Sequence, residues 1–234
     1  MSDLRVALVA EGPTDSVVIE AGLRAVLDRP FTLTLIQPEA TRPQMGTGWC
    51  GVFKWCREFD ARKFESLEGD PTLEGFDLFI VHLDADVAEA SYADGGTAVE
   101  LAAAHLPRLP CPQPCPPPSA AADQIRKVIL AWLGLSCAGQ RTVLCVPSKA
   151  IEAWVAVAVL EPSHALLFGI ECNLTVPVRL ASLPKSSRIC KTTREYRKHA
   201  STVTKNWSEI SEKCTQAERF GREVAAAVAS VSSQ

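Results

Sequence analysis

The chain has 234 residues, of which 47% are hydrophobic and 22% are charged, and its net charge is −3. This composition excludes an intrinsically disordered chain, and no global positive field indicates a nucleic-acid-binding protein, although a local basic patch stays possible. The length fits one domain, or one domain with a small appendage, and we expect a main domain over residues 1–160 followed by a mostly helical extension over residues 161–234.

The nine cysteines are irregularly spaced, and no secretory signal opens the sequence. We therefore expect a cytoplasmic protein in which most cysteines serve as small hydrophobic core residues. No apolar stretch approaches the roughly 20 residues that span a bilayer, so no membrane association is expected.

The first segments alternate between strand and helix patterns. Residues 4–10 predict a strand buried on both faces, a helix follows from Thr14 or Asp15 to about Leu27, and residues 31–36 predict a second strand. The later predicted elements are a helix over 52–67, a strand over 77–83, helices over 98–105 and 124–135, a strand over 142–146, a helix over 150–160 and helices from about 192 to the end.

This alternation predicts an α/β fold with a mainly parallel, four-stranded sheet flanked by helices. Residues 106–121 interrupt it, because six prolines between positions 110 and 118 prevent regular structure. Within this insert, Cys111 and Cys115 suggest zinc or a disulfide, but their spacing departs from C-x2-C, and a flexible surface loop is the favoured interpretation.

Three of the four predicted strands end in residues of related chemistry. The carboxyl ends of parallel strands meet at one edge of the sheet, where α/β proteins place their active sites. Five carboxylates at that edge would repel one another, and hard divalent cations such as Mg²⁺ or Mn²⁺ relieve this repulsion. The five carboxylates are Glu11, Asp15, Asp84, Asp86 and Glu152, and Ser148 and Lys149 also follow the fourth predicted strand.

Each of these residues also has a simpler interpretation. Glu11 alone reads as a loop acid, Asp15 as a residue favoured by a helix N-terminus, and Ser148 as a helix cap. The joint placement at strand ends favours the metal site. His82, two residues before Asp84, reads as a packed core histidine or as a support for that loop.

Three motifs carry a family resemblance: EGPTD at 11–15, DAD at 84–86 and SKAIEAW at 148–154. They resemble the TOPRIM domain of OLD-family (overcoming lysogenization defect) nucleases and, still more, small stand-alone TOPRIM-like proteins of bacterial phage-defence loci. The resemblance spans roughly residues 4–160. It implies a TOPRIM-like Rossmannoid fold and a two-metal, Mg²⁺- or Mn²⁺-dependent nuclease acting on DNA or RNA in antiviral defence.

The resemblance also implies roles and a partner. An ABC- or AAA-type ATPase encoded nearby is the expected partner, since the chain has no Walker A motif, and a homo-oligomer is also possible. The small relatives often carry an aspartate where this chain has the apolar residues 155–158, which leaves the number of ions open. The implied roles are metal ligands or their supports for Glu11, Asp15, Asp84, Asp86 and Glu152, an assisting ligand for Ser148, an electrostatic aid for Lys149, and a general base for Glu11.

A basic run precedes the C-terminal helix. It predicts either a solvated helix face or a phosphate-binding path, with Tyr196 and Trp207 as stacking surfaces. The candidate nucleic-acid-binding residues are Lys185, Arg188, Lys191, Arg194, Arg197 and Lys198.

Two other functions stay open. The first is a catalytically degenerate TOPRIM scaffold that serves a defence ATPase as partner subunit. Alternatively, the motif around Asp84 resembles that of haloacid-dehalogenase-type phosphatases, with this aspartate as nucleophile, although that motif normally follows the first strand rather than the third.

Overall fold

In the computed structural model, which describes residues 3–231, four strands form a single parallel sheet. The sheet order is β2-β1-β3-β4, so all four carboxyl ends lie at the same edge. The predicted α/β class with a parallel four-stranded sheet is confirmed. The strands are β1 (Leu4–Val9), β2 (Phe31–Gln37), β3 (Leu78–His82) and β4 (Thr142–Cys145).

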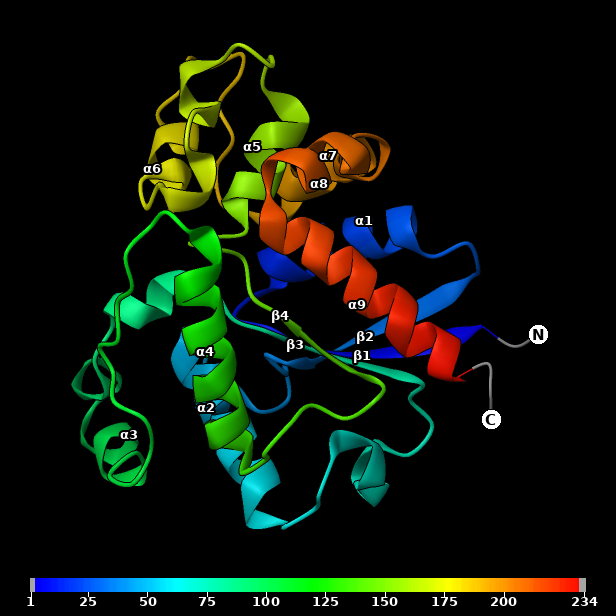
Figure 1. Ribbon diagram of the computed structural model, residues 1–234, viewed down its shortest axis with the longest axis vertical. Coiled ribbons are helices and arrows are strands. Elements are labelled where there is room, and N and C mark those ends of the chain that lie inside the picture. The colour runs from blue at the N-terminus through cyan, green and yellow to red at the C-terminus, as the bar shows by residue number, and fades with distance from the viewer. Residues whose placement is uncertain (1–2, 232–234) are drawn as a thin grey trace.

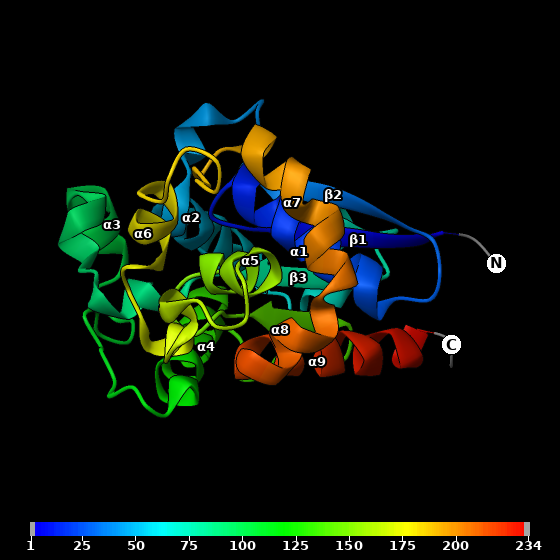
Figure 2. The ribbon, with the colours of Figure 1, turned by 90° about the horizontal axis from the view of Figure 1, so that it is seen from above.

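Helices cover both faces of the sheet (Figures 1 and 2). Helices α2 and α4 pack on one face, and α1, α5, α7, α8 and α9 pack on the other. The helices are α1 (Pro13–Val26), α2 (Gly48–Ala61), α3 (Thr97–Ala102), α4 (Pro118–Leu133), α5 (Glu152–Val159), α6 (Val176–Ala181), α7 (Thr193–Lys205), α8 (Trp207–Lys213) and α9 (Thr215–Val231).

The C-terminal helices complete the core on their face of the sheet. Trp154 of α5, Trp207 of α8 and Phe220 of α9 meet with ring centroids 5.5 to 6.1 Å apart. Helix α1 approaches this cluster at Gly22, where an added Cβ would lie 2.8 Å from the Trp207 ring. Residues 161–231 therefore share one hydrophobic core with residues 3–160.

Several element boundaries differ from those predicted. Helix α2 begins at Gly48 and ends at Ala61, six residues before the predicted end, because Lys63 adopts a left-handed conformation (φ 59°) that no α-helix accommodates. Helix α4 begins at Pro118 rather than Gln124, since proline is well suited to the first helical turn. Residues 106–117 are irregular, as predicted.

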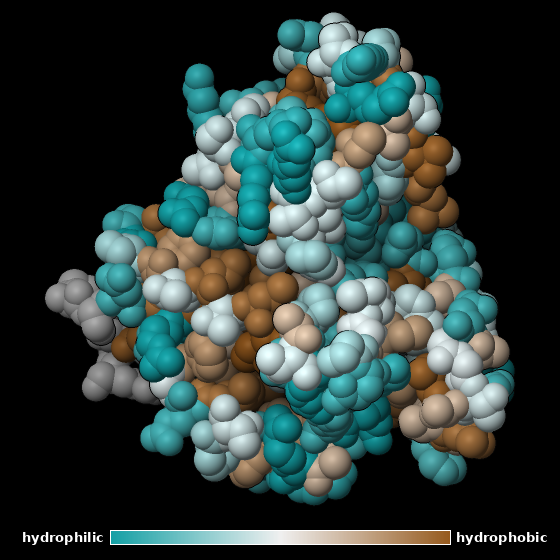
Figure 3. Space-filling view, turned by 180° about the vertical axis from the view of Figure 1, so that it is seen from behind, coloured by the Kyte–Doolittle hydropathy of each residue, from teal (hydrophilic) through white to brown (hydrophobic). Residues whose placement is uncertain are grey.

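The surface seen from behind mixes hydrophilic residues with hydrophobic groups (Figure 3). Three of the large, exposed hydrophobic residues in the described range belong to the segment between α5 and α7: Phe168, Leu174 and Val178. Across residues 3–231, no helix has the length and hydropathy needed to cross a membrane.

Candidate functional site

The loops that follow β3 and β4 run side by side beyond the sheet. The Ala85 amide donates to the Pro147 carbonyl at 3.1 Å, and the Asp86 amide donates to the Lys149 carbonyl at 3.0 Å. These bonds extend the β3–β4 pairing past the strand ends. The acidic loop after β3 is thereby held against the loop that leads into α5.

Glu11 and Asp84 connect the segments that follow β1, β3 and β4. The Asp84 amide donates to Glu11 Oε1 at 2.8 Å, and the Ile151 amide donates to Asp84 Oδ1 at 2.9 Å. The first bond joins β1 to β3, and the second joins β3 to the start of α5. Both carboxylates are therefore fixed by main-chain donors, as an organised site requires.

Asp15 and Glu152 form the other half of the acidic cluster, and the C-terminal extension reaches them. The Lys191 ammonium lies 2.8 Å from Glu152 Oε1 and 3.9 Å from Asp15 Oδ1. The buried Tyr196 hydroxyl donates to the same Glu152 oxygen at 2.9 Å. Glu152 Oε2 is buried without a hydrogen-bond partner.

These contacts change two predictions made from the sequence. Lys191 was expected to bind nucleic acid as part of a basic surface, but its ammonium is paired with the acidic cluster. Tyr196 and Trp207 were expected to stack on bases, and this is wrong because both side chains are buried in the core.

His82 lies beneath the acidic cluster at the end of β3 and is fully buried. Its Nε2 atom is 3.3 Å from Asp84 Oδ1. Burial alone would lower the pKa of His82, but the neighbouring acids, Asp84 first among them, outweigh it and raise the pKa to about 9. Both sequence interpretations of this histidine, as a packed core residue and as a support for Asp84, describe its position.

The carboxyl groups of the cluster are hard to ionise together. Burial, reinforced by the charge of Asp84, raises the pKa of Glu11 to about 8 and that of Asp86 to about 7. Burial also raises the pKa of Asp15 to about 6, against the opposing effect of His82. The cluster therefore binds protons or other positive charge near neutral pH.

The donor chemistry of the cluster fits a hard divalent cation. Carboxylate oxygens are the preferred ligands of Mg²⁺ and Mn²⁺, and Glu152 Oε2 is a buried oxygen without a partner. Among residues 3–231, however, no three His, Cys, Asp or Glu side chains are already arranged around a common point that would hold a metal ion. In this arrangement Lys191 supplies positive charge to Glu152 and Asp15.

Ser148 and Lys149 have other partners. The Ser148 hydroxyl donates to the Glu171 carbonyl at 2.6 Å and contacts the Pro118 carbonyl at 3.3 Å. The Lys149 ammonium lies 3.4 Å from Glu89 Oε1. The structure thus gathers the predicted acids at one edge of the sheet, while these two side chains bond to neighbouring segments.

The other predicted nucleic-acid-binding residues lie on the surface. Arg194 and Arg197 are exposed on α7, and Lys198 is exposed but paired with Glu195 at 2.6 Å. Lys185 and Arg188 are exposed in the segment before α7. This segment leads directly to Lys191, so the basic surface adjoins the acidic cluster.

No known family model matches the chain, and searches of curated proteins and solved structures likewise return no match.

Proposed function

We propose that this chain is a metal-dependent nuclease of TOPRIM type that hydrolyses phosphodiester bonds of DNA or RNA. The observation that supports this most strongly is the convergence of acids from three strand ends, fixed by the bonds from the Asp84 amide to Glu11 and from the Ile151 amide to Asp84. Carboxylates that are held in place in this way, and whose negative charge is not balanced by neighbouring cations, suit a site that binds metal ions and a phosphate.

The ligands proposed for Mg²⁺ or Mn²⁺ are acidic side chains of the cluster: Glu11, Asp15, Asp84, Asp86 and Glu152. When bound, such ions polarise phosphoryl oxygens and make water more acidic. Ser148 donates its hydroxyl proton to the Glu171 carbonyl, and its oxygen keeps lone pairs with which it would assist as a ligand.

The chain's own residues supply two further functions. Glu11, which follows β1 within the acidic cluster, is the proposed general base, and its carboxylate must be ionised to take a proton from water. Lys191, which is half exposed beside the acids, is placed to oppose negative charge on a bound phosphate. Lys149 is a second candidate to oppose the charge of a bound phosphate, provided that its ion pair with Glu89 breaks.

The exposed cations before and on α7 are the proposed path for the substrate backbone. The segment that carries Arg188 leads to Lys191, and Arg194 and Arg197 continue on α7. The double variant Arg194→Gln/Arg197→Gln is expected to weaken binding of all sequences alike and to reduce its salt dependence. An unchanged salt dependence would remove α7 from the path.

A second candidate is a scaffold subunit for a defence ATPase. Two observations favour it: the Lys191 ammonium already pairs with Glu152 and Asp15, and the apolar run 155–158 offers no further ligand. In this case the acidic cluster and Lys191 stabilise the fold, and the chain acts through its partner.

The experiment that tests the proposal is cleavage of supercoiled plasmid, single-stranded DNA and tRNA with Mg²⁺, Mn²⁺ or EDTA. We expect metal-dependent cleavage that falls about 100-fold or more in Asp84→Asn, which keeps the acceptor for the Ile151 amide. Glu100→Gln, at an exposed acid on α3, is the matched control and should retain activity.

The other outcomes separate the alternatives. Release of phosphate from a small phosphomonoester, with no cleavage of nucleic acid, would support the phosphatase. No hydrolysis in any condition, with or without the neighbouring ATPase, would favour the scaffold.

A further inference from the structure

A disulfide joins the proline-rich insert to the C-terminal extension. Cys115, in the insert, is bonded to Cys172, at the end of the short 3₁₀ helix η7 (Ile170–Cys172), and their Cα atoms are 5.5 Å apart. Of the sequence interpretations of Cys111 and Cys115, a disulfide applies to Cys115, although its partner is Cys172 and Cys111 is free. The other seven cysteines are free, including Cys111 of the same insert.

The two segments joined by this disulfide also hold Ser148. The hydroxyl of Ser148 contacts the carbonyls of Glu171, which precedes Cys172, and of Pro118, three residues after Cys115. The disulfide holds these two segments together, so it also limits how far apart the two carbonyls that accept from Ser148 can move. Its effect reaches the loop that enters α5 beside the acidic cluster.

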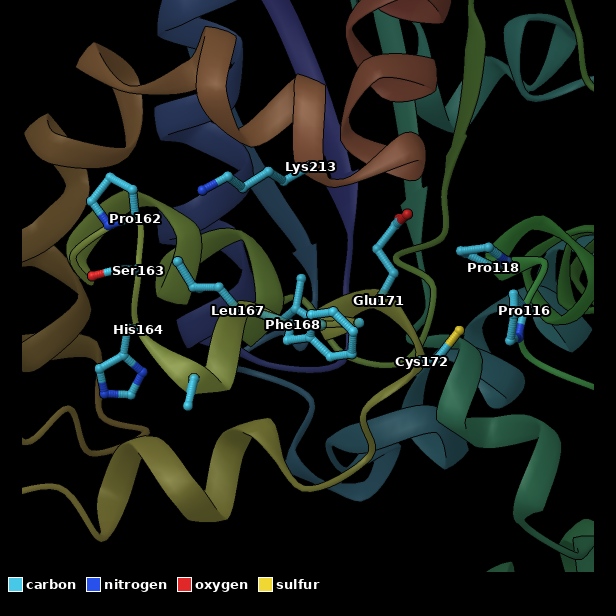
Figure 4. A pocket seen from close by; sticks show the side chains of 13 residues that line it. Pro116, Pro118, Pro162, Ser163, His164, Leu167, Phe168, Glu171, Cys172 and Lys213 are labelled. Atoms are coloured by element: carbon cyan, nitrogen blue, oxygen red, sulfur yellow. The ribbon is translucent and has the colours of Figure 1, made fainter.

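A cavity of about 700 Å³ gives access to the disulfide. Cys172 and Pro116 lie together at one end of the residues that line it, and Phe168, which is 92% exposed, is also part of the lining (Figure 4). Both bonded cysteines are only partly buried. A thiol in solution or on a partner can therefore reach this bond, and accessible disulfides are the ones that exchange readily.

We propose that Cys115–Cys172 is a thiol–disulfide exchange site for a dithiol reductant. Whether this bond is oxidised or reduced controls the local opening of the insert and of the loop around Ser148. The thiolate of the reductant attacks Cys172 Sγ, the bond to Cys115 breaks, and Cys115 takes up a proton. The second thiol of the reductant then displaces Cys172. Two electrons and two protons pass to the chain, and the reductant leaves as a disulfide.

The first measurement is the thiol count of the denatured protein, purified without reductant. We expect seven reactive thiols before reduction and nine after it. Nine thiols in protein purified under air would overturn the proposal, because the bond would then not form in solution.

The second measurement compares the oxidised and reduced native protein. Reduction by dithiothreitol is expected to speed tryptic cleavage after the exposed Arg108 about tenfold or more, because covalent closure no longer opposes local opening. Hydrogen exchange in the loop around Ser148 should rise as well. Equal cleavage and exchange in both states would overturn the proposed control.

Three variants separate the bond from general thiol chemistry. Cys115→Ser and Cys172→Ser should each behave like the reduced protein in the absence of reductant. Cys137→Ser, which removes an exposed free thiol, should behave like the oxidised wild type. If Cys137→Ser also shows faster tryptic cleavage and hydrogen exchange, the change would come from thiol chemistry elsewhere, and not from the Cys115–Cys172 bond.

The consequence for metal binding rests on the proposed function. If the acidic cluster binds metal, the Mn²⁺-induced rise in Tm should differ between the oxidised and reduced forms. An absence of any Mn²⁺ effect in both forms would count against the proposed function. The thiol count, proteolysis and hydrogen exchange would still decide the exchange site.

Discussion

The Lys191 ammonium lies 2.8 Å from Glu152 Oε1, where a basic residue of the C-terminal extension meets an acid from the end of the sheet. Asp15 Oδ1 lies 3.9 Å from the same ammonium, and Tyr196 donates to the same Glu152 oxygen. The extension therefore does more than cover a hydrophobic face. It also supplies a positive charge to the candidate site.

Lys191→Met tests the effect of this positive charge. Removal of the ammonium leaves Glu152 and Asp15 without their cation, so we expect a loss of about 1–3 kcal/mol, below that of a fully buried pair because Lys191 is half exposed. Mn²⁺ should restore more stability to this variant than to the wild type. The measurement is thermal unfolding with EDTA or Mn²⁺.

Lys198→Met is the matched control for Lys191→Met, since Lys198 pairs with Glu195 at the surface of α7. Its stability and its response to Mn²⁺ should stay close to those of the wild type. Equal responses of the two variants would show that Lys191 has no special relation to the acids.

Tyr196→Phe tests how Glu152 is positioned. The variant removes the hydroxyl that donates to Glu152 Oε1, which should lower stability by about 1 kcal/mol and weaken Mn²⁺ binding roughly tenfold. Titration calorimetry with Mn²⁺ measures the second effect. Tyr92→Phe, which loses the hydrogen bond to the Pro107 carbonyl and the acceptor for Trp132 Nε1, should be destabilised with unchanged Mn²⁺ affinity.

The stability of the metal-free protein should fall as the pH rises. A group whose pKa is higher in the folded chain holds its proton more tightly there, so its stabilising effect is complete below the unfolded pKa and is lost as the pH passes the folded pKa. Burial and Asp84 raise the pKa of Glu11 from 4.5 to about 8, and Asp84 raises that of His82 from 6.5 to about 9 against the effect of burial. The Tm in EDTA should therefore decrease between about pH 4.5 and pH 9.

Mn²⁺ should reverse part of this trend, because ligand carboxylates must lose their protons to bind a cation. The Mn²⁺-induced rise in Tm is expected to be larger at pH 8 than at pH 6. Glu11→Gln should flatten the dependence in EDTA. A Tm in EDTA that rises from pH 5 to pH 8 would contradict the charge distribution described for the cluster.

Phe220→Ala tests whether the extension belongs to the core. Phe220 is fully buried against Trp154 and Trp207, so its truncation should cost about 3–5 kcal/mol and lower the stability of the whole chain in one transition. Urea unfolding followed by far-UV circular dichroism measures this. Phe168→Ala, at a 92% exposed phenylalanine, is the control and should change little. Separate transitions for sheet and extension would contradict a shared core.

The elements with strong local patterns were predictable. The apolar run at 4–10 matches β1, and the alternating run at 31–36 matches β2. A strand buried on both faces has a continuous apolar run, whereas a strand buried on one face alternates between apolar and polar residues. The end of α2 was not predictable, since the left-handed turn at Lys63 carries no glycine to announce it. Residues 161–190 have short helices with too few periodic positions to recognise.

The sequence by itself determined which acids meet, because parallel strands deliver their carboxyl ends to one edge and Glu11, Asp84 and Glu152 follow three of them. Only the tertiary structure decided that Lys191 is paired with Glu152 and that Cys115 bonds Cys172. Both depend on how the extension packs over the sheet. Contacts between segments that are distant in the sequence depend on how the shared core packs, and neither segment carries a periodic pattern that predicts them.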